Sequence, residues 1–124
     1  MSSFSTRDRL QSFAYAWNGL RIVVRGQHNA WIHLTLSVLA LGLGFALGIS
    51  RLEWCAIVVV IGGVWAAEAF NTALESLADA AVPEQHPKIA AAKDAAAGAV
   101  LVAAIAAAVV GALVFVPRLL ALAS

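Results

Sequence analysis

Apolar residues in this chain fall into three long runs, and short polar segments bound each run. The runs predict helices at residues 30–49, 54–81 and 88–116, because about 20 consecutive apolar residues span the hydrocarbon core of a bilayer. A polar turn at 50–53 separates the first two runs. Pro83 ends the second, since the residue before a proline resists helical geometry. The pattern therefore predicts an all-α membrane protein with three transmembrane helices.

The segment before the first run has a different pattern. Between residues 6 and 27, apolar side chains recur at steps of three and four residues, and arginines accompany them. This periodicity is typical of an amphipathic helix, and a basic helix of this kind lies in the headgroup plane near anionic lipid. We expect an N-terminal surface helix, with an ordinary bundle helix as the alternative. Residues 1–29 lack a continuous apolar core and a small-residue cleavage site, so we expect no signal peptide.

Composition indicates one integral-membrane domain over residues 1–124. Hydrophobic residues make up 62% of the chain and charged residues 12%, against about 25% charged in an average soluble domain. Much of the surface must therefore face lipid. The net charge of +1 gives no global attraction to nucleic acid, and no nucleic-acid partner is expected. A single cysteine excludes an internal disulfide and a cysteine-based zinc site.

Basic residues are distributed unevenly around the three runs. Four arginines precede the first run and two lysines, Lys88 and Lys93, precede the apolar part of the third. At the other ends of the runs stand only Arg51 and Arg118. The positive-inside rule then predicts a multi-pass protein with its N-terminus in the cytoplasm. The connection between the second and third runs is expected on the same side.

Three acids and one amide share a face of the second predicted helix. Glu68, Asn71, Glu75 and Asp79 are three, four and four residues apart, which places them within an arc of about 80° on a helix that turns about 100° per residue. A charged side chain near the bilayer centre costs at least about 2.5 kcal/mol. A chain that keeps three acids on one stripe, at or near membrane depth, is expected to use them.

The stripe suits metal-assisted phosphoryl transfer when it is combined with Lys93 and Asp94. Magnesium takes one or two carboxylates together with phosphate oxygens, and a lysine offsets negative charge on the transferred phosphate. A lipid alcohol needs a base within hydrogen-bond reach, and Glu68 is the deepest of the acids. The sequence has no P-loop and no protein-kinase catalytic loop, so ATP would bind by a different arrangement.

Two other interpretations of the stripe remain open. It could be a polar seam between helices, with Asn71 bonded to another helix and Glu75 paired with Lys93. Alternatively, the chain could be a non-catalytic membrane assembly, or a small ion or proton carrier whose acids form a path. The acids gather at one end beside a lysine, which favours the kinase. Asp79 alone fits a helix end equally well.

The histidines carry less information than the acids. His86 lies in a polar loop, where a solvated side chain is expected. His28 and His33 stand at the start of the first run, and we interpret them as markers of the membrane interface more readily than as a metal site.

Several segments together match a known family. Residues 68–79 read EAFNTALESLAD, residues 92–101 read AKDAAAGAVL, and His86-Pro lies between them. Residues 15–21 read YAWNGLR, and residues 29–33 read NAWIH. Over about residues 13–105 the chain resembles the prokaryotic diacylglycerol kinase family, which also contains the undecaprenol kinases. The 29–33 segment is similar to the undecaprenol-kinase-like branch.

The resemblance implies a homotrimer in a bacterial inner or plasma membrane, with a surface helix and three spans per subunit. It implies composite active sites at the cytoplasmic face, built from more than one subunit. The implied reaction transfers the γ-phosphate of ATP, with Mg²⁺, to the primary alcohol of a membrane lipid. Diacylglycerol and undecaprenol are both candidates, and Gln27 with the 29–33 segment favours undecaprenol.

The resemblance also implies roles by position. Glu68 corresponds to the catalytic base on the lipid hydroxyl, and Glu75 to a magnesium ligand. Asn71 and Asp79 are supporting members of the motif. The positions on the ATP side are Tyr15, Gln27, Glu75, Glu84, Gln85, His86, Lys93 and Asp94.

Gln27 departs from the family pattern. Many members have a second metal-binding glutamate at this place, whereas glutamine offers a carbonyl oxygen without charge. Either the metal is held more weakly through Gln27, or Glu75 and the phosphates suffice.

Overall fold

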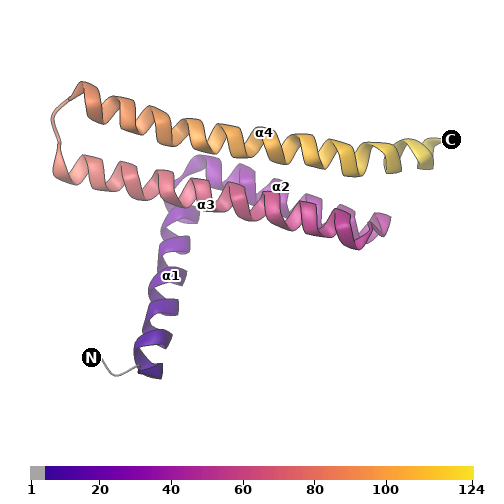
Figure 1. The fold of residues 1–124 in the computed structure, drawn as a ribbon, viewed down its shortest axis with the longest axis horizontal. Coiled ribbons are helices and arrows are strands. Elements are labelled where there is room, and N and C mark those ends of the chain that lie inside the picture. The colour runs from indigo at the N-terminus through magenta and orange to yellow at the C-terminus, as the bar shows by residue number, and fades with distance from the viewer. Residues whose placement is uncertain (1–4) are drawn as a thin grey trace.

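The computed structural model describes residues 5–124, which form four α-helices: α1 (Thr6–Gly26), α2 (His28–Leu47), α3 (Arg51–Ala81) and α4 (Pro87–Ala123). Helices α3 and α4 form an antiparallel pair, α2 packs along α3, and α1 projects sideways from this bundle (Figure 1). Helices α2, α3 and α4 are each long and apolar enough to cross a membrane. The predicted all-helical architecture with three spanning candidates is therefore confirmed. Residues 1–4 of the predicted domain lie outside the described part.

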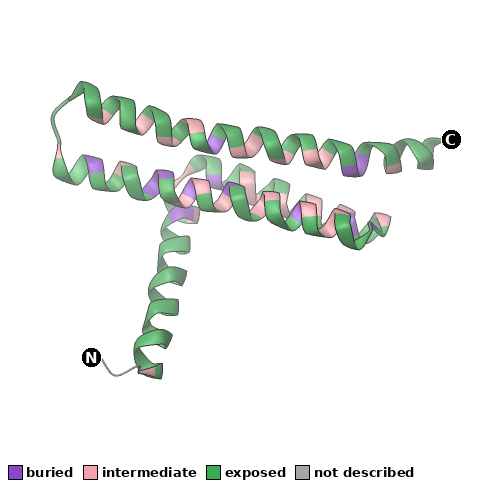
Figure 2. Ribbon diagram, viewed as in Figure 1, coloured by how far each residue is buried: buried purple, intermediate pink, exposed green. Residues whose placement is uncertain are grey.

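A single residue, Gln27, separates α1 from α2. Its extended backbone, with φ −117° and ψ 123°, interrupts the helix, while its N–H still donates to the Val23 carbonyl at 3.2 Å. Val23 is buried, but nearly all of α1 is exposed within the chain (Figure 2). The helix expected at 6–27 is present, and its location at the membrane surface stays a prediction.

The turn between α2 and α3 depends on Gly48 and Ser50. Gly48 has a φ of 59° and ends α2 in the left-handed conformation, which glycine adopts without strain. Ser50 and Glu53 then form a capping box: the Glu53 N–H donates to Ser50 Oγ at 3.2 Å, and the Ser50 N–H donates to Glu53 Oε2 at 2.6 Å. Because this box satisfies first-turn N–H groups, α3 begins at Arg51, ahead of the predicted start at residue 54.

Helix α4 continues past Pro117 to Ala123, which corrects the predicted end at residue 116. A proline removes one backbone hydrogen bond and crowds the preceding turn, but it does not end this helix. The following turn is held by Arg118, whose Nη2 donates to Glu53 Oε2 at 2.6 Å and whose Nη1 donates to the Leu47 carbonyl at 3.4 Å. These contacts tie the C-terminal part of α4 to the α2–α3 turn.

The packed core is small and lies near that turn. Its buried members are Ile49, Ile57, Val114 and Phe115. Most large apolar side chains elsewhere are exposed, and most of the ribbon in Figure 2 has the green of exposed residues. A soluble monomer rarely exposes so much contiguous apolar surface, so lipid or neighbouring chains must cover it.

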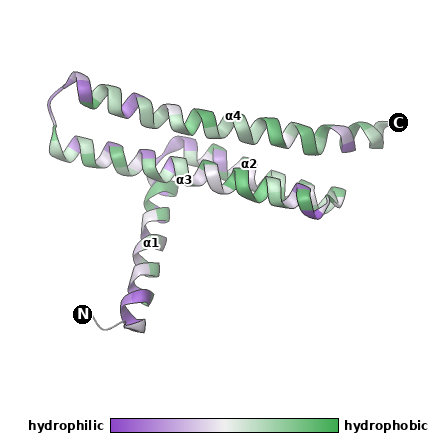
Figure 3. Cartoon of the chain, in the orientation of Figure 1, coloured by the Kyte–Doolittle hydropathy of each residue, from purple (hydrophilic) through white to green (hydrophobic). Residues whose placement is uncertain are grey.

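Hydrophilic residues concentrate on α1 and at the α3–α4 connection (Figure 3). Helix α3 has 31 residues and is about 46 Å long at about 1.5 Å per residue, whereas the hydrocarbon core is about 30 Å thick. In Figure 1, α3 and α4 run beyond the junction of α1 and α2 before they connect. The last turns of α3 lie beside this polar connection, and they carry the predicted site residues Glu75 and Asp79.

Candidate active site

The four residues of the predicted stripe are graded in burial along α3. Glu68 is 1% exposed and Asn71 8% exposed, Glu75 is half-buried and Asp79 is exposed. Because α3 is uninterrupted from Arg51 to Ala81, the spacing of three, four and four keeps these residues along one side of the helix. The stripe thus leads from the bundle interior to the polar connection between α3 and α4.

Glu68 is a buried acid whose Oε2 atom has no hydrogen-bond partner among residues 5–124. His33 Nε2, on α2, lies 3.5 Å from this oxygen, which is longer than an ordinary N–H···O contact. Asn71 Oδ1 and Thr72 Oγ1 are also buried, and within residues 5–124 neither has a hydrogen-bond partner. Buried polar atoms nearly always have partners in folded proteins. This part of α3 is therefore suited to receive donors from outside the chain.

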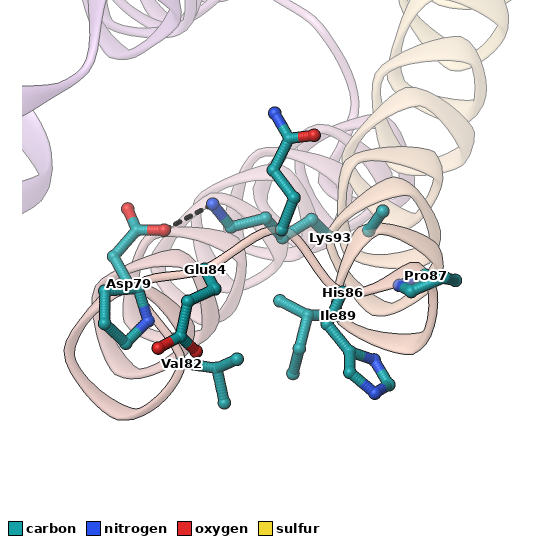
Figure 4. Close-up of a pocket in the computed structure, with 10 residues that line it drawn as sticks. Asp79, Val82, Glu84, His86, Pro87, Ile89 and Lys93 are labelled. Carbon is teal, nitrogen blue, oxygen red and sulfur yellow. Dashed lines mark hydrogen bonds and ion pairs between the residues drawn. The ribbon is translucent and has the colours of Figure 1, made fainter.

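A pocket of about 570 Å³ opens where α3 connects to α4 (Figure 4). Across it, Lys93 Nζ contacts Asp79 Oδ1 at 2.5 Å. The pocket is lined by Asp79, Val82, Pro83, Glu84, Gln85, His86, Pro87, Ile89, Ala90 and Lys93. Half of the residues predicted on the ATP side, namely Glu84, Gln85, His86 and Lys93, thus surround one opening.

Lys93 pairs with Asp79 and not with Glu75, the partner considered from the sequence. The two helices run antiparallel from a short connection, so Asp79, near the end of α3, faces the first turns of α4. Glu75 still contributes to the electrostatic environment of Lys93. The side chains of Lys93 and Asp79 are 35% and 69% exposed. Because solvent screens such a pair, the ammonium can exchange Asp79 for a phosphate group at low cost.

His86 has a structural contact that the sequence did not predict. It is the N-cap residue of α4, and its Nδ1 accepts a hydrogen bond from the Lys88 N–H at 3.1 Å. Pro87 follows at the first helical position, where its missing N–H costs nothing. Since Nδ1 is engaged, Nε2 is the ring atom that remains available to a ligand at the pocket.

The other residues predicted on the ATP side do not line this pocket within one chain. Tyr15 is 72% exposed on α1, which projects away from the bundle (Figure 1). Gln27 lies at the α1–α2 junction, and Asp94 is exposed on α4 beside Lys93. Glu75 lies on α3 between Glu68 and the pocket residue Asp79. One chain therefore assembles only part of the predicted site.

A metal held by protein ligands alone is not supported by residues 5–124. No group of three or more His, Cys, Asp or Glu side chains in this range is placed to hold a metal ion. Magnesium that arrives with a nucleotide takes most of its ligands from phosphate and water and needs only one or two carboxylates. The half-buried carboxylate of Glu75 fits that second kind of binding.

A second groove, of about 490 Å³, lies between α3 and α4 at the level of Asn71. Apart from Asn71 its lining is apolar, consisting of Ala67, Phe70, Ala73, Leu74, Leu77, Ala96 and Ala99. Alanine side chains are short, so they leave room along the helix pair. This apolar groove therefore lies beside the polar stripe.

Besides the Lys93–Asp79 pair, sequence reasoning missed two further ion-pair contacts between helices. One joins His33 to Glu68, and the other joins Arg118 to Glu53. Spacing along one helix cannot reveal either contact, because the partners belong to different helices. The only available signal was the 29–33 segment, which singled out the position of His33 without assigning it a role.

Comparisons with known proteins identify the family to which this chain belongs. The family described as "Prokaryotic diacylglycerol kinase" matches residues 14–115. An undecaprenol kinase of Bacillus subtilis is 38% identical over 109 residues, which cover 88% of this chain and 89% of the relative. A diacylglycerol kinase of Synechocystis is 39% identical over 114 residues, which cover 91% of this chain and 65% of that relative. The search of solved structures gave no match. This chain belongs to the prokaryotic diacylglycerol kinase family and is a lipid kinase.

Proposed function

We propose that this protein transfers the γ-phosphate of ATP, with Mg²⁺, to the primary alcohol of a membrane lipid at the cytoplasmic face. The observation that carries the proposal is the order of groups along α3. A buried carboxylate with an unpaired oxygen, Glu68, is followed by the half-buried Glu75 and then by the pocket that holds Lys93. The lipid can thus approach this face of α3 at Glu68, and the nucleotide can approach it from the pocket at the α3–α4 connection.

In this reaction Glu68 takes the proton of the lipid hydroxyl. The hydroxyl oxygen forms a bond to the γ-phosphorus as the bond between that phosphorus and the leaving ADP oxygen breaks. Phosphoryl transfer asks little covalent chemistry of the protein, so most of the catalysis comes from positioning and charge stabilisation. A base inside the bundle and a cation at its polar end meet those two needs. Together with family membership, this arrangement favours the kinase over an ion or proton carrier.

On the nucleotide side, Lys93 contacts phosphate oxygens in place of Asp79. Glu84, Gln85 and His86 border the same pocket, and Asp94 contacts the nucleotide from the adjacent position on α4. Glu75 would hold the magnesium ion, Gln27 would offer a second, uncharged oxygen ligand, and the ion would offset charge on the phosphates. Asn71 supports the site beside Glu68.

The lipid lies with its hydroxyl at Glu68 and its hydrocarbon chain along an apolar surface, such as the groove between α3 and α4 that Asn71 lines. We take undecaprenol as the first candidate substrate and diacylglycerol as the second. The chain covers 89% of the undecaprenol kinase but 65% of the diacylglycerol kinase. The 29–33 segment of the sequence points in the same direction.

Tyr15 and Gln27 complete the site in an assembly. Because α1 projects from the bundle, its Tyr15 can reach the pocket of a neighbouring subunit. We therefore propose a homotrimer with shared sites, with α1 at the cytoplasmic membrane surface and the N-terminus in the cytoplasm. Cross-linking of cysteine variants at Tyr15 and Gln85 checks this arrangement, since linked dimers and trimers are expected and linked monomers are not.

The activity is tested with the purified full chain in mixed micelles, labelled ATP, and either undecaprenol or diacylglycerol. We expect label in the lipid fraction only when Mg²⁺ is present, with a higher kcat/KM for undecaprenol. Glu75→Gln should raise the Mg²⁺ concentration needed for half-maximal rate, whereas Glu53→Gln serves as the matched acid control. ATP hydrolysis without transfer to either lipid would show that the proposed function is wrong.

A further inference from the structure

Two contacts join α2 to α3 within one turn of Glu68. His33 Nε2 lies 3.5 Å from Glu68 Oε2, and Trp65 Nε1 donates a hydrogen bond to Ser37 Oγ at 3.1 Å. The His33 side chain is 13% exposed and that of Glu68 is 2% exposed. The proposed base therefore lies against an imidazole, although nothing in the reaction as written above uses His33.

The carboxylate of Glu68 needs a partner if it is to act as a base. A general base must lie within hydrogen-bond reach of the hydroxyl in the right orientation, and a neighbouring donor can fix the orientation of a carboxylate. Within residues 5–124, His33 is the cationic or donor side chain that lies in ion-pair range of Glu68. If the imidazole of His33 only filled space, the buried Glu68 Oε2 would have no donor nearby among residues 5–124.

The position of His33 is maintained by its neighbours. Ser37 Oγ donates to the His33 carbonyl at 2.6 Å and accepts the Trp65 N–H. Trp65 lies one turn before Glu68 on α3, as Ser37 lies one turn after His33 on α2. The two contacts therefore fix the register between the helices at the level of the carboxylate. This arrangement holds the imidazole facing Glu68.

We propose that His33 is a positioning residue for Glu68. Its Nε2–H donates to the carboxylate, fixes its orientation and turns its other oxygen towards the lipid hydroxyl. The 3.5 Å separation shortens when substrate closes the site, as catalytic hydrogen bonds often do on substrate binding. This inference rests on the proposed function, because it assigns a partner to the base of that reaction.

The test compares His33→Gln with His33→Asn. The glutamine amide nitrogen reaches the place of Nε2, whereas the asparagine amide is too short. We expect His33→Asn to lower kcat by about 10- to 100-fold, the usual effect of removing a group that orients a functional ligand, with the KM values for ATP and lipid unchanged. His33→Gln should recover most of the rate. The control is His28→Asn, an exposed residue of the same helix, which should match the parent protein.

A double-mutant cycle with Glu68→Gln separates positioning from a general structural role. If His33 acts through the carboxylate, His33→Asn has no further effect once the carboxylate is absent. Equal losses with and without the Glu68 carboxylate would overturn the inference, as would an unchanged kcat in His33→Asn. Should His33→Asn unfold, Ser37→Ala provides the second variant, and it must lower kcat in the parent but not in Glu68→Gln.

The outcomes also separate this inference from the proposed function. If the parent protein phosphorylates no lipid, the proposed function fails before His33 is considered. If the parent is active and both His33 variants are equally active, only the positioning role fails.

Discussion

Glu53 and Glu68 lie on the same helix in opposite surroundings. Glu53 Oε2 accepts hydrogen bonds at 2.6 Å from both the Ser50 N–H and Arg118 Nη2. Glu68 Oε2 is buried, has no hydrogen-bond partner within residues 5–124, and has His33 Nε2 at 3.5 Å. The Glu53 carboxylate accepts hydrogen bonds from other groups of the chain, whereas Glu68 Oε2 accepts none within residues 5–124. The partners of an acid, and not its residue type, thus distinguish a structural anchor from a chemical group.

The two ends of the molecule differ in the same way. At the Glu53 end, the capping box, the Arg118 contacts and the buried cluster around Ile57 form one packed unit. At the other end, the helices enclose a pocket with a solvent-screened ion pair and an apolar groove. The hydrogen-bonded ion pair and the buried cluster thus lie at one end, and the largely exposed ion pair and the pocket lie at the other. Paired substitutions can test this division.

The largest contrast is expected between Glu68→Gln and Glu53→Gln. Loss of a general base lowers kcat by about 10²- to 10⁴-fold. The kcat of Glu68→Gln should therefore decrease by a factor in that range, while the variant still binds ATP. Glu53→Gln should keep kcat near the parent value and lower the midpoint of thermal unfolding by a few degrees. Lipid phosphorylation and unfolding in the same detergent measure both effects. Normal turnover by Glu68→Gln would show that the base is misassigned.

The next contrast is between the two cations, Lys93 and Arg118. Lys93→Met removes the charge that is expected to meet phosphate, so kcat/KM for ATP should drop by about 100-fold or more. Arg118→Met removes contacts to Glu53 and to the Leu47 carbonyl, so it should weaken the fold and leave kinetics per folded molecule unchanged. Equal kinetic losses for both variants would contradict the division between the ends.

A smaller effect is expected from packing at the turn between α2 and α3. A Cβ at Gly44 would lie 2.8 Å from Trp54 Cη2 and 3.1 Å from Ile49 Cδ1, so Gly44→Ala should destabilise the protein by about 1–3 kcal/mol. Gly42→Ala is the control on the same helix, because nothing lies within 4 Å of its Cβ. Denaturation of the two variants side by side decides the point, and a Gly44→Ala protein as stable as Gly42→Ala would refute it.

The smallest change is expected for Asp79→Asn. The Asp79–Lys93 pair is largely exposed, and exposed pairs contribute little. If the pair must open for phosphate, KM for ATP should change by at most about fivefold, and the fold should be unaffected. Titration of ATP at saturating lipid measures this. A loss as large as that of Lys93→Met would make Asp79 a part of the site and not a resting partner of the lysine.

Helix positions were more predictable than helix ends. The three apolar runs correctly indicated three helices long and apolar enough to span a membrane, because a lipid environment demands long uninterrupted apolar segments. The ends depended on particular contacts. With the Ser50–Glu53 capping box, α3 begins at Arg51, three residues before the predicted start. Helix α4 continues beyond Pro117, where Arg118 contacts Glu53. Such contacts involve pairs of residues, so the local pattern does not contain them.

The candidate site was predictable in part. The stripe from Glu68 to Asp79 and the polar connection with His86 and Lys93 were visible in the sequence, because helical periodicity alone places them. The Lys93–Asp79 pair, the N-cap role of His86 and the contact of His33 with Glu68 were not. Each depends on how far one helix reaches past another, which periodicity does not specify.

By itself, the amino-acid sequence determined that this protein is helical, that three segments are apolar enough to span a membrane, and that Glu68, Glu75 and Asp79 share one helix face. These properties follow from hydrophobicity and from the period of the α-helix, which are local. Only the tertiary structure decided that Glu53 accepts hydrogen bonds from Ser50 and Arg118, whereas Glu68 has an oxygen without a hydrogen-bond partner among residues 5–124. That distinction depends on distances between α2, α3 and α4, because a carboxylate becomes an anchor or a base according to the donors that other helices bring to it.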